Sequence, residues 1–265
     1  MSTHPSDALH VVPHYRDLVR IVPLFVPPDV VAPIHIAGAQ TATPQLTYRG
    51  GPLLTAVKVF TVFWGADWQH AQAALAKDLN AFFDSILKSA LMDELAEYST
   101  AGHKIAHGSL AGTTTLPSPA PPKSTADTAI RNMLQHQIAT NAAFPKPDPN
   151  LLYFVYLPQG VTVVQGGSRS CQAFCGYHDN VSGQIFYAVM PYPNCNGCLG
   201  GLSVQDSLTS TSSHELCEAI TDPIPGQGWY DDANGEIGDI CAWKTKKIGQ
   251  YTVQLEWSNK AGKCI

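Results

Sequence analysis

The segment from Ser213 to Pro223 constrains the fold of this chain more than any other, because it reads Ser-His-Glu-Leu-Cys-Glu-Ala-Ile-Thr-Asp-Pro. On a helix, side chains four residues apart lie on one face, so His214 and Glu218 can bind one ion from adjacent turns. Glu215 then projects beside His214, within reach of a water on that ion. Pro223 lacks a backbone N–H and clashes with the preceding turn. The segment therefore predicts a metal-binding helix that stops one turn after Glu218.

The segment that follows the helix is expected to supply the third ligand. A catalytic zinc takes three protein ligands and keeps one position open. After a segment rich in proline and glycine, the sequence continues Gly-Glu-Ile-Gly-Asp, in which Asp239 is the expected third ligand and Glu236 its rival. One imidazole and two carboxylates offset more of the ion's charge than two imidazoles do, so the bound water should be less acidic. Such a site suits a slower hydrolase or a harder ion.

Calcium is an alternative or additional ion. The run Asp-Asp-Ala-Asn-Gly-Glu, residues 231–236, places oxygen-bearing side chains around a glycine, although it does not complete the EF-hand pattern. A plain Asx-turn explains the same residues. Asp222, one turn beyond Glu218, is expected to cap or support the helix rather than bind the ion.

This helix resembles the active helix of the thermolysin-like zinc peptidases, the gluzincins, whose motif is His-Glu-x-x-His with a glutamate ligand farther along the chain. The resemblance covers only the helix and the return segment. It implies that His214 is the first zinc ligand, Glu215 the general base and Asp239 the downstream carboxylate. Glu218 stands where the family has its second histidine. The implied activity is hydrolysis of peptide bonds in a peptide or protein substrate.

A second resemblance covers more of the chain. The Exordium, or phosphate-induced, proteins of plant cell walls and their bacterial relatives are similar in the apolar run Val57–Gly65, in Cys171-x-x-x-Cys175-Gly176-x-His178, in the close pair Cys195 and Cys198, and in Thr221-Asp222-Pro223. Plant members often lack the His-Glu-x-x-Glu ligands. This resemblance implies the alternative function, a non-catalytic cell-surface or wall-associated module with a structural metal or calcium site.

The seven cysteines leave at least one thiol unpaired, and Cys217 inside the predicted helix is the expected one. The spacing of the four cysteines between residues 171 and 198 suits a structural zinc ribbon and disulfides alike. The Exordium resemblance and the loop-rich surroundings favour disulfides. Cys241 and Cys264 are candidates for a third bridge.

Composition excludes several classes of function. Hydrophobic residues make up 45% of the 265 residues and charged residues 14%, as in folded globular proteins. The net charge of −5 gives no polybasic surface for nucleic acid or an anionic membrane. No apolar run is long enough to span a bilayer, and residues 1–13 lack the basic flank and apolar core of a signal peptide. Localisation stays open, since the families that the chain resembles are commonly secreted.

The pattern along the chain predicts an α/β (α+β) fold: a zincin-like single domain with a mixed sheet, a long backing helix and an active-site helix. Residues 1–50 are predicted to form an extended, proline-rich N-terminal arm, and residues 51–265 the zincin-like metal-binding catalytic domain. Periodicity predicts strands at 57–65, 104–110 and 151–157, and helices at 67–98 and after Ser124. The strand at 184–190 is expected to form the rim of the cleft, where an extended substrate can pair.

Among the histidines, only His214 has a ligand partner at helical spacing. His178 is a candidate catalytic residue that could reach the cleft and donate to the transition state, and a surface or structural histidine is the alternative. A glycoside hydrolase using Glu215 and Glu218 is disfavoured, because neighbours at this spacing are poorly placed to flank a sugar bond.

Overall fold

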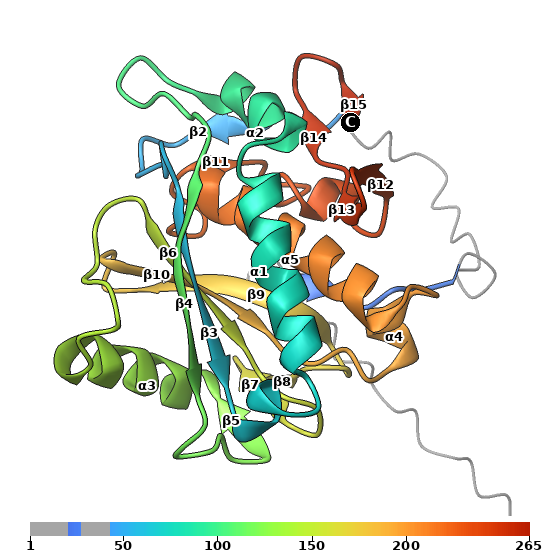
Figure 1. Ribbon diagram of the computed structural model, residues 1–265. Coiled ribbons are helices and arrows are strands. Elements are labelled where there is room, and N and C mark those ends of the chain that lie inside the picture. The colour runs from blue at the N-terminus through green and yellow to red at the C-terminus, as the bar shows by residue number, and fades with distance from the viewer. Residues whose placement is uncertain (1–20, 28–42) are drawn as a thin grey trace, which may run out of the picture.

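A mixed six-stranded sheet forms the centre of the protein in a computed structural model that describes residues 21–27 and 43–265 (Figure 1). This agrees with the mixed α/β class that the sequence predicts. Across the sheet the strands are β1 (Ile21–Pro23), β9 (Phe174–Val181), β10 (Ile185–Met190), β6 (Leu151–Tyr156), β3 (Lys58–Trp64) and β4 (Ser109–Leu116).

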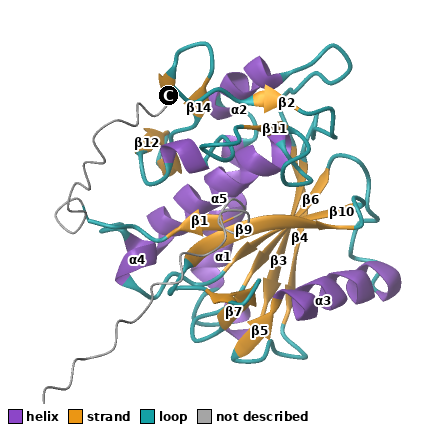
Figure 2. Ribbon diagram, turned by 180° about the vertical axis from the view of Figure 1, so that it is seen from behind, coloured by secondary structure: helices purple, strands orange, loops and turns teal. Residues whose placement is uncertain are grey.

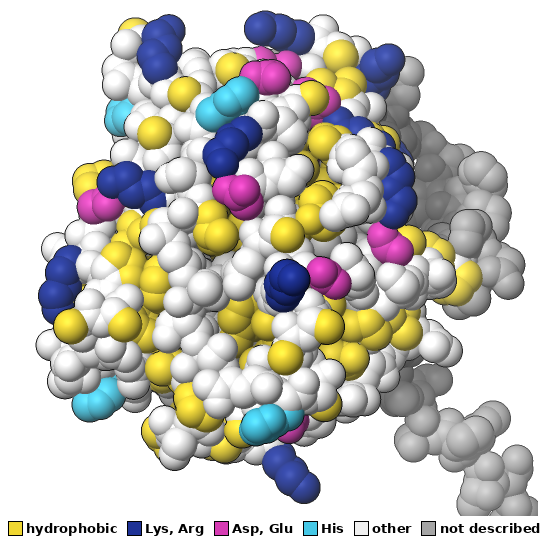
Figure 3. Space-filling view, in the orientation of Figure 1, with side chains coloured by type: hydrophobic (Ala, Val, Ile, Leu, Met, Phe, Trp, Pro, Cys, Tyr) yellow, Lys and Arg dark blue, Asp and Glu magenta, His cyan; other side chains and the backbone are white. Residues whose placement is uncertain are grey.

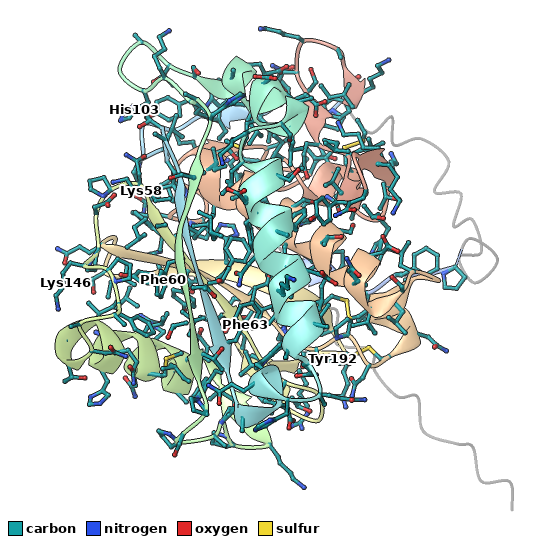
Figure 4. The ribbon with its side chains drawn as sticks, in the orientation of Figure 1. Lys58, Phe60, Phe63, His103, Lys146 and Tyr192 are labelled. Carbon is teal, nitrogen blue, oxygen red and sulfur yellow. A yellow bond between two sulfur atoms is a disulfide. The ribbon has the colours of Figure 1, made fainter. Side chains whose placement is uncertain are left out.

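Strand direction changes toward one edge of the sheet. β10, β6, β3 and β4 run parallel, whereas β9 is antiparallel to β10 and β1 is antiparallel to β9. Parallel strands need cover on both faces, which explains why every residue of β6 is buried. Figure 4 marks Phe60 and Phe63 on β3, which belong to separate apolar clusters on opposite faces of the sheet.

Helices cover both faces. One apolar cluster joins α1 (Ala73–Ile86) and α5 (Val204–Thr221) to the sheet, and α5 passes behind α1 in the view of Figure 1. The other cluster includes Ile130 and Leu134 of α3 (Asp127–Thr140), which packs on the opposite face (Figure 2). None of the helices in the described part of the chain is long and apolar enough to cross a membrane.

The long helix predicted over residues 67–98 is wrong, because the chain forms four shorter pieces there. These are η1 (Ala66–Gln69), α1, α2 (Ala90–Leu95) and η2 (Ala96–Tyr98). The hydroxyl of Ser89 donates to the carbonyl of Ile86 at 2.8 Å and accepts the N–H of Leu91 at 3.2 Å. A serine that bonds to the backbone on both sides ends one helix and caps the next.

Strand predictions had mixed outcomes. The strand at 151–157 is confirmed as β6, but the one at 104–110 begins later, as β4. The helix predicted after Ser124 is α3, which begins at Asp127, because Ser124 lies in β5 (Ser124–Ala126) and Ala126 is the N-cap of the helix. The predicted rim strand is also wrong: β10 lies inside the sheet between β9 and β6.

Two described parts of the predicted N-terminal arm pair with the domain. β1 adds to the main sheet beside β9, and β2 (Thr47–Tyr48) pairs with β11 (Trp229–Tyr230). The indole N–H of Trp243 donates to the carbonyl of Pro23 at 2.8 Å, and Phe25 packs edge-on against the Trp243 ring. The rest of the predicted arm lies outside the described residues.

Six of the seven cysteines form disulfides. Cys171 bonds to Cys195, Cys175 to Cys198 and Cys241 to Cys264, whereas Cys217 is free and buried. The disulfide prediction and the free Cys217 are confirmed. The other elements are β7 (Thr162–Gln165), β8 (Ser168–Arg169), α4 (Asn196–Leu199), η3 (Asp239–Cys241), β12 (Thr245–Ile248), β13 (Tyr251–Gln254), β14 (Trp257–Ser258) and β15 (Lys263–Cys264). On the face drawn in Figure 3, lysine and arginine side chains are scattered and interspersed with acidic ones.

Candidate metal centre

The helix α5 carries the predicted ligands and is buried from Ser207 to Thr221. Ser203 caps its first turn by accepting the N–H of Asp206 at 3.1 Å. The helix lies so close to β9 that a Cβ on Gly176 would come within 2.6 Å of the Thr211 methyl group. Glycine at this position therefore lets α5 sit directly on the strand that carries His178.

His214 is held in one tautomer. The amide of Gln254 donates to the carbonyl of Gly238 at 2.9 Å, which leaves its oxygen 3.0 Å from His214 Nδ1. Since that oxygen can only accept, His214 Nδ1 carries a proton, and the lone pair of Nε2 is the one that a metal would use. This is the arrangement in which a histidine binds a metal through Nε2.

Two carboxylates face that lone pair. His214 Nε2 is 2.9 Å from Glu218 Oε1 and 3.9 Å from Asp239 Oδ1, and ligand atoms of all three residues lie within 4.8 Å of one another. The buried Nε2 forms no hydrogen bond with any described residue. Buried polar atoms are rarely left without a partner, and these donor types suit a divalent cation. The residues therefore fit the metal that the sequence predicts.

His178 lies in the same cluster, which makes its alternative placement on the surface wrong. It is only 1% exposed on β9, with Nδ1 3.0 Å from Glu215 Oε2 and 3.5 Å from Glu218 Oε2. On the other side of the ring, Nε2 is 3.2 Å from the Asp222 carbonyl and 3.6 Å from Glu236 Oε1. The strand order of the sheet, rather than any local pattern, brings it beside Glu215.

The rival ligands Asp239 and Glu236 both reach the cluster, from different sides. Asp239 groups with His214 and Glu218, and its backbone N–H donates to Glu218 Oε1 at 3.2 Å. Glu236 is fully buried beside His178, and neither of its oxygens accepts a hydrogen bond from the described residues.

Asp222 has a local structural role, in line with the expectation that it caps the helix end. Its carboxylate accepts backbone N–H groups from the turn that follows α5, at 2.5 Å from Gly226, 3.0 Å from Gln227 and 2.5 Å from Gly228. Asp231 likewise accepts the N–H groups of Ala233 and Asn234, at 2.8 and 2.9 Å. The 231–236 run therefore contains the Asx-turn that was one of its two interpretations.

Burial and mutual repulsion dominate the electrostatics of the cluster. Burial, followed by the charge of Glu218, raises the pKa of Glu236 and of Asp239 well above the usual range. Burial also raises the pKa of Glu215, despite its hydrogen bond with His178. More carboxylates are buried here than the positive charge can balance, and a bound cation would relieve this repulsion.

Glu218 and His178 shift in the opposite sense to what burial alone would produce. Burial favours neutral Glu218, but the adjacent imidazoles of His214 and His178 lower its pKa to about 2. Burial favours neutral His178, but hydrogen bonds and charges from Glu215 and Glu218 raise its pKa to about 10. Glu218 is therefore the carboxylate most strongly held in its charged form.

Two further residues at the site have no motif or spacing that predicts them. Gln254, which orients His214, is 40 positions away in β13. Glu256 is buried with neither oxygen hydrogen-bonded among the described residues, and burial raises its pKa well above the usual range. Lone glutamine and glutamate residues near the end of a chain carry no spacing signal, so only the packing of the C-terminal segment on α5 reveals them.

Comparisons with known proteins provide little guidance. No family model and no curated protein matches the chain. One similar chain comes from the solved "Structure of a chaperone-substrate complex"; it is 16% identical, with 74% of this chain and 28% of that chain covered and a TM-score of 0.30. This chain thus spans less than a third of the length of that one, and a likeness this weak supports no inference about fold or function.

Proposed function

We propose that this protein is a metal-dependent hydrolase of peptide bonds, with a divalent cation, zinc as first candidate, held by His214, Glu218 and Asp239. One observation carries the proposal: the buried His214 Nε2 has no hydrogen-bond partner among the described residues and faces two carboxylates. Gln254 fixes the other ring nitrogen. Metal-binding histidines usually have such a partner on their second nitrogen.

The surrounding residues suit a hydrolytic reaction. A bound divalent cation supplies a Lewis acid and lowers the pKa of water. Glu215 Oε2 is held 3.0 Å from His178 Nδ1, whereas Oε1 accepts no hydrogen bond from the described residues and can take a proton from the attacking water. Burial raises the pKa of Glu215 toward the range of an effective base. His178, whose pKa is raised to about 10 by its contacts with Glu215 and Glu218, holds a proton with which to stabilise negative charge on the substrate.

The arrangement of elements supports a zincin-like architecture within this proposal. α1 and α5 pack on one face of a mixed sheet, and the antiparallel strand β9 lies beside α5. Among the three ligands, Asp239 alone has partly exposed side-chain atoms, at 12%, so substrate would approach past Asp239.

A second candidate function is a non-catalytic module in which the cation holds the C-terminal segments together. The complete burial of His214, Glu218 and Glu236 favours it, because structural metal sites are closed. In that case Glu215 would have no role in turnover.

The first test is elemental analysis of the purified chain by mass spectrometry. Wild type should contain a divalent metal that the His214→Ala/Glu218→Ala double variant lacks. The matched control is His136→Ala, an exposed histidine on α3, which should keep the metal. Absence of metal from wild type, or metal retained in the double variant, would contradict the proposed site.

Catalysis is tested separately with a quenched-fluorescent peptide library. Glu215→Gln should keep the cation bound by His214 yet lower hydrolysis by about 10²–10⁴-fold, the usual contribution of a general base. Full activity in Glu215→Gln would remove it as the base. Metal-loaded wild type that cleaves no member of the library would favour the structural module.

A further inference from the structure

The two oxygens of Glu218 face two different groups of ligand atoms. Oε1 is 2.9 Å from His214 Nε2, on the side of Asp239. Oε2 is 3.5 Å from His178 Nδ1, on the side of Glu215. A carboxylate placed between two sets of ligands in this way has the geometry of a bridge between two cations.

The second group has the spacing of a coordination shell. His178 Nδ1 is 3.0 Å from Glu215 Oε2 and 3.5 Å from Glu218 Oε2, and ligand atoms of the three residues lie within 4.8 Å of one another. Nitrogen and oxygen ligands at about 2.1 Å from a tetrahedral ion lie about 3.4 Å apart. The three atoms could therefore contact one ion with little movement.

Unpartnered oxygens lie within this second group. Glu218 Oε2 and Glu215 Oε1 are buried, and neither accepts a hydrogen bond from the described residues. Leaving buried carboxylate oxygens without a partner is costly. The first cation position does not explain Glu218 Oε2, because Glu218 faces His214 through Oε1.

The carboxylates of the cluster can balance two divalent cations. Four buried or largely buried carboxylates pair with His178 or His214, those of Glu215, Glu218, Glu236 and Asp239. The ion pairs of these side chains within the described residues are with His178 and His214, and none is with lysine or arginine. One divalent cation balances at most two of these four carboxylates, so carboxylates remain to bind a second cation.

We propose that the site binds two divalent cations bridged by Glu218, one between His214 and Asp239 and the second between His178 and Glu215. The inference rests on the metal site of the proposed function and deepens it. Two cations joined by a bridging carboxylate are a known clamp for hydrolytic reactions, with ions about 3.5–4 Å apart. In this form His178 is a ligand and not the proton donor of the one-cation site, Glu215 binds through Oε2, and its Oε1 is still free to accept a proton.

The test counts bound ions. The full-length, chelator-stripped chain is dialysed against Zn²⁺ or Mn²⁺ without thiol reductant, so that the disulfides stay closed, and bound metal is measured by mass spectrometry. Wild type should bind about two equivalents, because Glu218 bridges two adjacent ions. His178→Gln and Asp239→Asn each remove a ligand of one ion, so each should bind about one equivalent. His136→Gln, the exposed control, should bind as wild type does.

A spectroscopic measurement on wild type makes the test independent of whether the variants fold. Electron paramagnetic resonance of the Mn²⁺-loaded protein should show an exchange-coupled spectrum. His178→Gln should show the uncoupled spectrum of a single ion.

The possible outcomes separate this inference from the proposed function. One equivalent in both wild type and His178→Gln would mean that a protonated His178 takes the place of the second cation; the inference would fall and the proposed function would stand. No bound metal in wild type would overturn both. If His178→Gln still binds two equivalents, the second ion lies elsewhere and the inference alone is overturned. The same holds if wild type binds two Mn²⁺ ions whose spectrum shows no exchange coupling.

Discussion

The imidazole of His214 is oriented by a short chain of contacts rather than by its helix alone. Gln254 accepts from Nδ1 and donates to the carbonyl of Gly238, so the return segment is tied to the ring that it covers. Asp239 follows Gly238 directly and is thereby directed toward Nε2. A change at Gly238 should therefore alter metal binding without removing any ligand.

Gly238→Ala tests this coupling. A Cβ at this position would lie 2.9 Å from His214 Cγ and Nδ1 and 3.0 Å from Glu218 Oε1, so the ring and the carboxylate must shift apart. We expect Zn²⁺ affinity to fall about tenfold or more, the scale on which changes around a metal's ligands usually act. Competition with a chromophoric chelator measures it.

The matched control is Gly102→Ala, where an added Cβ meets no atom within 4 Å. It should bind Zn²⁺ as wild type does. Equal affinity in the two variants would show that the return segment does not position the ligands.

Among the elements, the β12–β13 hairpin is hydrogen-bonded to α5, and these contacts set the position of Gln254. Thr209 Oγ1 donates to the carbonyl of Thr252 at 2.8 Å, and the N–H of Gln254 donates to Ser213 Oγ at 2.9 Å. At the start of α5, Asp206 accepts from the Thr252 hydroxyl and, at 2.9 Å, from Lys247 Nζ. Asp206 thus anchors the hairpin to the first turn of the metal-binding helix.

Asp206→Asn should show a characteristic dependence on pH. Hydrogen bonds from Lys247 and Thr252 lower the pKa of Asp206 from 3.8 to about 2. A lowered folded-state pKa contributes stability that is present above the unfolded value and lost as pH falls through the folded value. The contact with Lys247 is partly exposed and screened by solvent, so we expect a loss of about 1 kcal/mol at pH 7.

Thermal unfolding of both proteins between pH 7 and pH 2 measures this effect. The difference between them should shrink as the pH falls from about 4 to about 2. Asp67→Asn, in the exposed part of η1, is the control and should follow wild type throughout. A difference that stays constant down to pH 2 would contradict the role given to the Asp206 carboxylate.

At the scale of the whole molecule, disulfides fix the segments that deliver residues to the cluster. Cys175, three positions before His178 on β9, is bridged to Cys198 of α4. Cys241, two positions after Asp239, is bridged to Cys264 in the last strand. The site is thus assembled from segments that are linked covalently as well as packed.

Removing the C-terminal bridge should weaken both the fold and the site. A bridge closing a loop of this size contributes about 3 kcal/mol, so Cys241→Ala/Cys264→Ala should unfold about 5–10 °C below wild type. Zn²⁺ affinity should fall as well, because Asp239 lies next to the lost bridge. Calorimetry and the chelator competition measure the two effects.

Cys217→Ala is the control, since it removes a buried thiol without breaking a bridge. Its melting temperature should fall less, and its Zn²⁺ affinity should be unchanged. A double variant as stable as wild type would show that packing alone holds the C-terminal segment.

Local pattern alone determined part of this protein. The helical period places His214 and Glu218 on one face, and Pro223 ends the helix that carries them. A continuous apolar run predicts the buried strand β6, and an odd number of cysteines requires a free thiol, which is that of Cys217. Local pattern was misleading where a single serine, Ser89, interrupted a continuous apolar period.

Tertiary structure alone decided the rest. His178 meets Glu215 across 37 positions because β9 adds antiparallel to β10 under α5, and Gln254 meets His214 across 40 positions because a hairpin docks on the helix. Strand order and docking depend on how the whole apolar surface is buried, which no short segment encodes. The sequence therefore specified the helix with its candidate ligands, and the packing of distant segments determined which other side chains surround them.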